Sequence, residues 1–162
     1  MQRRVLFLCQ ANLCRSPLAE AVFQRHLALR GMSDKVRVSS AGISRSSQGQ
    51  PADPRAVKLA LQHGYQHIQQ HRARPVQTAW FAQHDLILVM DQDNLRSALK
   101  RCPDEHHHKV HLLLSYAGLP APHIVPDPYF GSAQGFQRVL SLCESSVDGA
   151  LRRLLMDRTP VH

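Results

Sequence analysis

The sequence has no apolar run that approaches the roughly 20 residues of a membrane-spanning helix. Arg3 and Arg4 precede a short apolar run, Val5 to Leu8, but this run is too short for a signal peptide and no small-residue cleavage site follows it. These absences predict a soluble, cytoplasmic protein that makes no contact with membranes.

Cysteine is also scarce. The chain has four widely spaced cysteines: Cys9, Cys14, Cys102 and Cys143. They lack the paired spacing of metal sites, so the pattern favours free thiols in a reducing compartment over a disulfide scaffold. A run of three histidines, His106 to His108, has no Cys or carboxylate framework around it, and we expect it to lie in a solvated loop. The sequence therefore predicts neither a metal nor a cofactor.

Acidic residues are outnumbered, with 12 Asp and Glu against 20 Lys and Arg, which gives a net charge of +8. The basic residues nevertheless stand in ones and twos, with no run of five and no basic strand interleaved with aromatics. This distribution argues against nucleic acid as a partner. It fits a positive surface that attracts phosphorylated or acidic substrates by electrostatic steering.

What the chain does contain is a regular alternation of strand and helix signals. At 162 residues it is long enough for one well-filled domain and too short for two ordinary ones. Strands are expected over residues 5–8, 35–39, 85–90 and 110–114, and helices from residue 17 and over 53–61, 79–83, 91–100 and 136–156. Strands separated by helices predict an α/β fold, a single Rossmann-like domain with a parallel sheet and helices on both faces. We expect this domain to cover residues 1–157 and a C-terminal tail to cover 158–162.

The most informative segment joins the first strand to the first helix. Cys9 ends an apolar run, and Arg15, Ser16 and Pro17 follow five residues later in a Cys-x5-Arg-Ser-Pro motif. Ser16 is a favourable N-cap and Pro17 fits the first helical position, so we expect the helix to begin there. Residues 10–15 must then turn with their backbone N–H groups facing a concavity, as loops at helix N-termini do around phosphate.

Two side chains would give this concavity its chemistry. The guanidinium of Arg15 could grip two equatorial oxygens of a phosphoryl group. The thiol of Cys9 would lie at the base of an electropositive cup, where it is expected to ionise and act as a nucleophile at neutral pH. The cup would lie at the carboxyl ends of the strands, where parallel sheets bind ligands. The pattern predicts hydrolysis of phosphate esters through a thiophosphate intermediate.

A thiolate that attacks a phosphate monoester also needs a group that protonates the departing oxygen. Asp127 is the candidate, because prolines on both sides stiffen its loop and the following Tyr129 and Phe130 could flank a ring-bearing substrate. A plain Asp-Pro turn accounts for the same residues equally well, so the residues alone leave both interpretations open. Asp91, at the end of a predicted strand, is expected to help orient the cleft.

These motifs closely resemble the low-molecular-weight protein tyrosine phosphatases. The resemblance runs nearly end to end and is carried by residues 9–20, 40–42, 51–55, 71–74, 90–91, 94–95 and 127–129. A Cys-x5-Arg-Ser-Pro loop near the N-terminus, paired with a late Asp-Pro-Tyr, is specific to that family. The resemblance implies a four-stranded parallel sheet wrapped by helices and a metal-independent phosphotyrosine phosphatase.

The resemblance also implies catalytic roles. Cys9 would be the nucleophile, Arg15 the phosphate clamp, and Asp127 the general acid that later activates water. Cys14 would be a neighbouring thiol able to form a reversible disulfide with Cys9 under oxidation. The phosphate-binding loop would comprise Gln10, Ala11, Asn12, Leu13, Cys14 and Ser16.

Further residues would support the loop or line the cleft. By the resemblance, Ser16 would hydrogen-bond the thiolate of Cys9, while Asn12, with a positive φ, and Ser40 would hold the loop in shape. Asp91 would add support to the loop. The substrate cleft would be lined by Ser46, Ser47, Tyr129 and Phe130.

Three positions depart from the family pattern. Ala11 stands where the family often has Gly, which requires an ordinary backbone conformation at this residue. Ser46 and Ser47 stand where some members carry a large aromatic, which predicts a wider or more polar pocket. Phe130 replaces a second Tyr found in some relatives, which removes a phosphorylation site and keeps the packing.

Two related activities and one binding function remain as alternatives. Arsenate reductases share the fold but need further cysteines to relay a disulfide, and neither Cys102 nor Cys143 is placed as a paired relay. Protein arginine phosphatases typically have Thr where this chain has Leu13, whose apolar bulk favours a flat phosphotyrosine ring. A phosphate-binding module with little turnover is the third alternative. The expected partners are a tyrosine-phosphorylated protein, with a tyrosine kinase as one candidate, and phosphate or other oxyanions at the loop.

Overall fold

A computed structural model describes residues 2–157 of the chain, and the predicted tail, 158–162, lies outside the described residues. The strands are β1 (Arg3–Cys9), β2 (Val36–Gly42), β3 (Leu86–Val89) and β4 (Val110–Leu112). The helices are α1 (Arg15–Leu29), α2 (Pro54–Gln62), α3 (Thr78–Gln83), α4 (Gln92–Arg101), α5 (Leu113–Tyr116) and α6 (Ala133–Met156). Two 3₁₀ segments, η1 (Gln66–Gln70) and η2 (Asp104–Lys109), complete the order.

The four strands form one parallel sheet in the order β2-β1-β3-β4. Cys9 at the end of β1 is in register with Gly42 at the end of β2, and Leu8 is in register with Val89 at the end of β3. The carboxyl ends of these strands therefore meet at one edge of the sheet. The predicted α/β fold with a four-stranded parallel sheet is confirmed.

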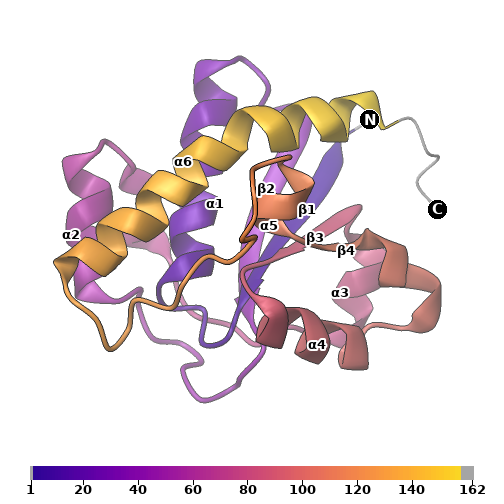
Figure 1. Ribbon diagram of the computed structural model, residues 1–162, viewed down its shortest axis with the longest axis horizontal. Helices are drawn as coiled ribbons and strands as arrows, with labels where there is room; N and C mark the ends of the chain where they lie inside the picture. Colours follow the sequence, from indigo (N-terminus) through magenta and orange to yellow (C-terminus); the bar gives the residue numbers. More distant parts are fainter. Residues whose placement is uncertain (1, 158–162) are drawn as a thin grey trace.

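Helices cover both faces of the sheet (Figure 1). On one face α1, α2 and α6 pack over Phe7 and Leu88, with Phe23 and Phe136 fully or almost fully buried between the layers. On the other face α3 and α4 pack over alternate strand residues such as Ile87, with Phe81 of α3 completely buried. The alternation arises because successive side chains in a strand point to opposite faces. This core fixes the sheet edge on which the site is built.

Several element boundaries differ from those expected. The fourth strand ends at Leu112, and Leu113 and Leu114 begin the short helix α5, because a short apolar run suits a buried helix as well as a strand. The second strand continues to Gly42, and α6 begins at Ala133 rather than at Phe136. The histidines 106–108 lie in the 3₁₀ segment η2 and not in a loop.

Within residues 2–157, no helix is both long and apolar enough to cross a membrane. The same part of the chain holds no group of three or more His, Cys, Asp or Glu side chains arranged to bind a metal ion.

Candidate active site

A tight loop connects β1 to α1 and forms a cup around the thiol of Cys9. The turn is possible because Asn12 has φ 60°, the only positive φ of a non-glycine residue in the described chain. Asn and Asp tolerate this left-handed region better than other side chains. Ala11 therefore has an ordinary backbone conformation, as its Cβ requires. The close approach of β2 also needs Gly42, where a Cβ would lie 3.1 Å from the backbone carbon of Ala11.

The thiol of Cys9 is 3 % exposed and faces the first turn of α1. Its Sγ lies 3.0 Å from the hydroxyl of Ser16 and accepts a hydrogen bond from the backbone N–H of Ser16 at 3.4 Å. Donors at a helix N-terminus stabilise a thiolate relative to a thiol. The expectation that Ser16 caps the helix is wrong, because α1 begins at Arg15 and the N-cap position is Cys14. The hydroxyl of Ser16 faces the thiol instead of a free helix N–H.

Asn12 holds the loop in place through hydrogen bonds from its side chain and its backbone oxygen. Its side-chain amide donates to the hydroxyls of Ser16 at 2.8 Å and Ser40 at 3.1 Å, and its Oδ1 accepts from the backbone N–H of Arg74 at 3.0 Å. Its backbone oxygen accepts from Nε2 of His71 at 2.7 Å. Every polar group of Asn12 named here has a partner, so the left-handed turn is held from β2 and from residues 71–74. The role of Arg74 in this network was not evident from the sequence.

Ser40 is itself supported by Glu20, which forms an ion pair with His67. Glu20 of α1 contacts Nε2 of His67 at 2.6 Å. Burial alone would raise the pKa of Glu20, but hydrogen bonds from His67 and Ser40 outweigh it and hold that pKa below its usual value. The same contact with Glu20 raises the pKa of His67. Glu20 is therefore ionised and holds Ser40, which in turn supports the loop.

Arg15 lies almost completely buried on the wall of the cup. Its Nη1 donates to Oδ2 of Asp91 at 2.6 Å and to the backbone oxygen of Val125 at 3.0 Å. Asp91 is itself fixed, because its Oδ1 accepts from the backbone N–H of Asn94 and caps α4. One side of the guanidinium is thus held by protein, and Nη2 is directed toward Asp127, whose Oδ2 is 3.7 Å away.

Asp127 lies on the long loop between α5 and α6, at the mouth of the cup. Its Oδ1 accepts from the backbone N–H of Tyr129 at 3.0 Å, and its side chain is about half exposed. The loop is fixed upstream by Val125, which is fully buried and whose N–H donates to the backbone oxygen of Met90. The carboxylate is therefore oriented over Arg15 and remains accessible to a substrate.

The cup opens into a pocket of about 270 Å³ that brings together residues predicted for three different roles. The lining residues are Cys9, Gln10, Ala11, Leu13, Cys14, Arg15, Ser46, Ser47, Asp127, Tyr129 and Phe130. Tyr129 and Phe130 meet edge to face with ring centroids 4.9 Å apart, and Phe130 is 95 % exposed. Ser40 and Asp91 do not line the pocket and instead hold the loop and Arg15 from behind.

Cys14 and Arg55 connect the cup to α2. Burial, reinforced by the charge of Asp53, raises the pKa of the Cys14 thiol to about 12, so this thiol is neutral. Arg55 pairs with Asp53 at 2.8 Å and donates to the backbone oxygen of Tyr129 at 2.8 Å. The sequence did not predict that Arg55 contacts the loop that carries Asp127. In the sequence, Arg55 belongs to an ordinary helix start.

A family model matches nearly the whole chain. Residues 4–159 match the model of the low molecular weight phosphotyrosine protein phosphatase family. A low molecular weight protein-tyrosine-phosphatase from Streptomyces coelicolor is 39 % identical over 154 residues, which cover 93 % of each chain.

Solved structures of similar proteins have the same fold. A protein tyrosine phosphatase from Entamoeba histolytica, crystallised with Hepes in its active site, superimposes with a TM-score of 0.91 at 33 % identity and covers 98 % of this chain and 100 % of its own. Wzb from Vibrio vulnificus, solved in complex with benzylphosphonate, has a TM-score of 0.79 at 28 % identity and covers 96 % of this chain and 100 % of its own.

Proposed function

The chain belongs to the low molecular weight phosphotyrosine protein phosphatase family, and from this premise we propose how its own residues carry out the reaction. Its activity is that of a protein-tyrosine phosphatase. The observation that carries the assignment of residues is the convergence of Cys9, Arg15 and Asp127 on one pocket. These three residues would be the nucleophile, the phosphate clamp and the general acid.

In the first step the thiolate of Cys9 attacks the phosphorus of the substrate. A P–S bond forms as the P–O bond to the tyrosine ring breaks, and Asp127 transfers its proton to the departing phenolic oxygen. The equatorial oxygens are held by the loop N–H groups and by the guanidinium of Arg15, already oriented by Asp91. The products are free tyrosine side chain and phosphocysteine.

In the second step water replaces the sulfur. Asp127, now a carboxylate, accepts a proton from the attacking water, whose oxygen forms the new bond to phosphorus. The P–S bond breaks, and the electron pair returns to Cys9 as a thiolate. The Ser16 hydroxyl and N–H beside Sγ support this leaving group. Inorganic phosphate then leaves through the open mouth of the pocket.

The walls of the pocket favour a flat aromatic ester. Leu13 supplies apolar surface to the pocket, while Tyr129 and Phe130 line it and are exposed. Ser46 and Ser47 contribute small, polar side chains to its lining. The benzylphosphonate complex of the Vibrio vulnificus relative supports a ring-bearing phosphoryl ligand here. We therefore propose a tyrosine-phosphorylated protein as substrate, with phosphate and related oxyanions as small ligands of the loop.

Substrate class is tested by comparing wild type and Cys9→Ser on peptides that carry phosphotyrosine, phosphoserine or phosphoarginine, and on arsenate with thiol donors. Fast release from phosphotyrosine alone, lost in Cys9→Ser and insensitive to chelators, is the expected result. Activity confined to phosphoarginine or arsenate would contradict the substrate assignment. Phosphate release that is no faster from wild type than from Cys9→Ser would contradict phosphatase activity and favour a phosphate-binding module.

The role of Asp127 predicts a leaving-group effect. Asp127→Asn should lower kcat/KM for alkyl phosphates, which need a proton donor, by about 10²–10⁴-fold, and lower it much less for stabilised phenolates such as p-nitrophenolate. The measurement is kcat/KM across a series of leaving groups. Equal losses for all esters would remove Asp127 from the role of general acid.

Two further properties are part of the proposal. All four cysteines are free thiols, which supports a reducing, cytoplasmic setting. Under peroxide, Cys9 would be oxidised to a sulfenic acid, and the Cys14 thiol would displace water from it to form a disulfide. Mass spectrometry of the peroxide-treated protein should then find a loss of two hydrogens that Cys14→Ser prevents.

A further inference from the structure

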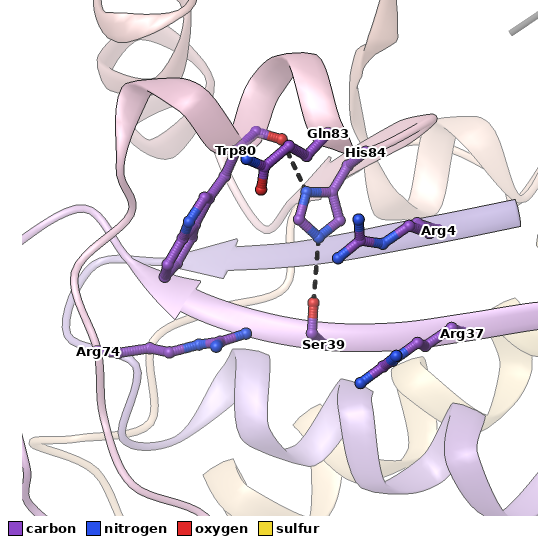
Figure 2. A pocket seen from close by; sticks show the side chains of 7 residues that line it. All are labelled: Arg4, Arg37, Ser39, Arg74, Trp80, Gln83 and His84. Atoms are coloured by element: carbon purple, nitrogen blue, oxygen red, sulfur yellow. Dashed lines mark hydrogen bonds between the residues drawn. The ribbon is translucent and has the colours of Figure 1, made fainter.

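A second hollow, which we call the basic pocket, lies apart from the catalytic cup and has a volume of about 160 Å³. Its lining residues are Arg4, Arg37, Ser39, Arg74, Trp80, Gln83 and His84 (Figure 2). It shares no residue with the pocket above Cys9. Its volume is more than ten times the roughly 10–15 Å³ that a cavity needs to hold one water molecule.

The sheet itself brings the positive charges together. Arg4 of β1 and Arg37 of β2 are register partners in the parallel sheet, so their side chains stand on the same face. Two residues further along, Ser39 lies on that face as well. Arg4 and Arg37 are exposed, so this part of the face opens to solvent. Arg74 enters from the opposite end of the hollow, and Figure 2 shows all three guanidinium groups around Ser39.

These guanidinium groups lack counter-charges. Among residues 2–157, no carboxylate lies within salt-bridge distance of Arg4, Arg37 or Arg74, whereas Arg15, Arg30, Arg55 and Arg96 are all paired. Asp85, which follows His84 in the sequence, accepts a hydrogen bond from the backbone N–H of Arg4 and not from a guanidinium. Three like charges around one hollow repel one another, and a bound anion would relieve this repulsion.

The remaining walls are already ordered. Nδ1 of the buried His84 donates to the backbone oxygen of Trp80 at 2.7 Å, so the neutral ring accepts at Nε2 from the hydroxyl of Ser39 at 3.3 Å. Burial lowers the pKa of His84, which agrees with a neutral ring. Arg74 stacks 4.7 Å from the centroid of Trp80, and its Nε donates to the backbone oxygen of Ser40. These contacts hold Arg74 in place and leave its terminal nitrogens for a ligand.

We propose that the basic pocket is a binding site for a tetrahedral oxyanion of the phosphate class. Guanidinium groups match such oxyanions because each can present two parallel N–H donors, and three of them arriving from different directions suit a doubly charged tetrahedral ligand. A singly charged planar carboxylate would leave most of these donors unused. The site is separate from the catalytic reaction and does not depend on the proposed roles of Cys9 or Asp127.

The chain offers a built-in probe, since Trp80 is its only tryptophan. Trp80 fluorescence is titrated with inorganic phosphate, and separately with acetate, at constant ionic strength, with the backbone amide NMR shifts of Ser39 and His84 as a second readout. We expect a saturable change with phosphate and none with acetate. No saturable change in either readout, or an equal response to acetate, would overturn the proposal.

Substitutions test whether the change in Trp80 fluorescence comes from phosphate in the basic pocket. Arg37→Gln should raise the Kd for phosphate about tenfold and Arg4→Gln/Arg37→Gln should abolish saturation, because each removes a charge-assisted contact. Arg138→Gln, which removes an exposed arginine of α6 outside the basic pocket, should bind as wild type. Unchanged hydrolysis of p-nitrophenyl phosphate by Arg37→Gln would verify that this variant is folded.

One more variant separates the two oxyanion sites. The backbone of Arg74 contacts Asn12, so phosphate in the catalytic cup could itself alter Trp80 fluorescence. Arg15→Lys weakens the cup and leaves the basic pocket intact. If the Trp80 response persists in Arg15→Lys and is lost in the double variant, it originates in the basic pocket. If it persists in the double variant, or is lost in Arg15→Lys alone, the proposal fails.

Discussion

Asp91 has two structural functions, one with each carboxylate oxygen. Oδ2 pairs with the buried guanidinium of Arg15 at 2.6 Å, and Oδ1 caps α4 through the N–H of Asn94 at 2.7 Å. A buried arginine needs such a partner, because an unpaired charge in that position is strongly unfavourable. The position of Arg15 is therefore coupled to the start of α4, a helix on the other face of the sheet.

The two functions of Asp91 can be separated by substitution. Asparagine caps a helix as well as aspartate but cannot neutralise Arg15, so Asp91→Asn should lower kcat/KM about tenfold or more and lower the melting temperature through the unpaired guanidinium. Asp91→Ala should lower kcat/KM similarly and cost about 1 kcal/mol more of unfolding free energy than Asp91→Asn, through loss of the cap. The measurements are steady-state kinetics and thermal unfolding. Full activity in Asp91→Asn would show that its charge does not position Arg15.

At the scale of elements, the start of α2 holds the loop that carries Asp127. Arg55 uses its guanidinium to contact Asp53, the backbone oxygen of Tyr129 and the ring of Phe136, whose centroid is 4.6 Å away. These contacts connect the start of α2 to the loop at Tyr129, 74 residues further along the chain, and to the adjoining helix α6. The loop between α5 and α6 is thus positioned by α2 and α6 as well as by its own prolines.

Loss of this connection should affect acid catalysis selectively. Arg55→Met keeps apolar packing on Phe136 but removes the hydrogen bond to Tyr129, so we expect kcat/KM to fall about tenfold for alkyl phosphates and little for p-nitrophenyl phosphate. The control is Arg96→Met, which removes an exposed arginine of α4. An equal loss on both substrates would indicate a general disturbance of the pocket rather than displacement of Asp127.

The long helix α6 approaches α5 closely at Gly149. A Cβ at this position would lie 1.9 Å from the backbone oxygen of Ala117, whereas at Gly135 the nearest atom, in Pro128, would be 3.5 Å away. Gly149→Ala should therefore destabilise the protein by about 1–3 kcal/mol despite the better helix propensity of alanine. Gly135→Ala should be neutral or stabilise by up to about 1 kcal/mol. Denaturant unfolding of both variants makes the comparison, and a stabilised Gly149→Ala would contradict the packing argument.

At the scale of the whole molecule, histidines couple stability to pH. Burial lowers the pKa values of His71, His84 and His111, whereas the contact with Glu20 raises that of His67. A lowered pKa means that the unfolded chain binds protons first, so this stability is present above about pH 6.5 and is lost as pH falls. The raised pKa of His67 acts in the opposite sense, giving stability below about pH 6.5 that is lost as pH rises.

Three histidines with lowered pKa values and one with a raised pKa value predict a melting temperature that falls from about pH 7.5 to 5.5. The fall should be about 2–4 °C for each kcal/mol of unfolding free energy lost. His71→Gln, which retains a donor for the backbone oxygen of Asn12, should flatten this dependence. His67→Gln should steepen it, because the opposing contribution disappears. Thermal unfolding across the pH range tests all three proteins, and a melting temperature that rises on acidification would contradict the balance.

Much of the fold was predictable from local patterns. Apolar runs of strand length, helix signals such as Asp53-Pro54, and the connection from Cys9 to Arg15 predicted a parallel sheet with helices on both faces. These signals are local because strand, turn and helix preferences act between near neighbours. Boundaries were less predictable, as at Leu113 and Leu114, because a buried apolar run does not distinguish a short helix from the end of a strand.

The sequence by itself determined the family, the fold class and the residues whose spacing within one motif carries chemistry, from Cys9 to Arg15. Only the tertiary structure decided which distant residues complete the proposed active site and the proposed oxyanion site of the basic pocket. Arg55 reaches the loop of Asp127, and Arg74 supports Asn12 while it lines the basic pocket. The physical reason is that these contacts join segments brought together by sheet register and helix packing, and no local spacing in the chain records such distances.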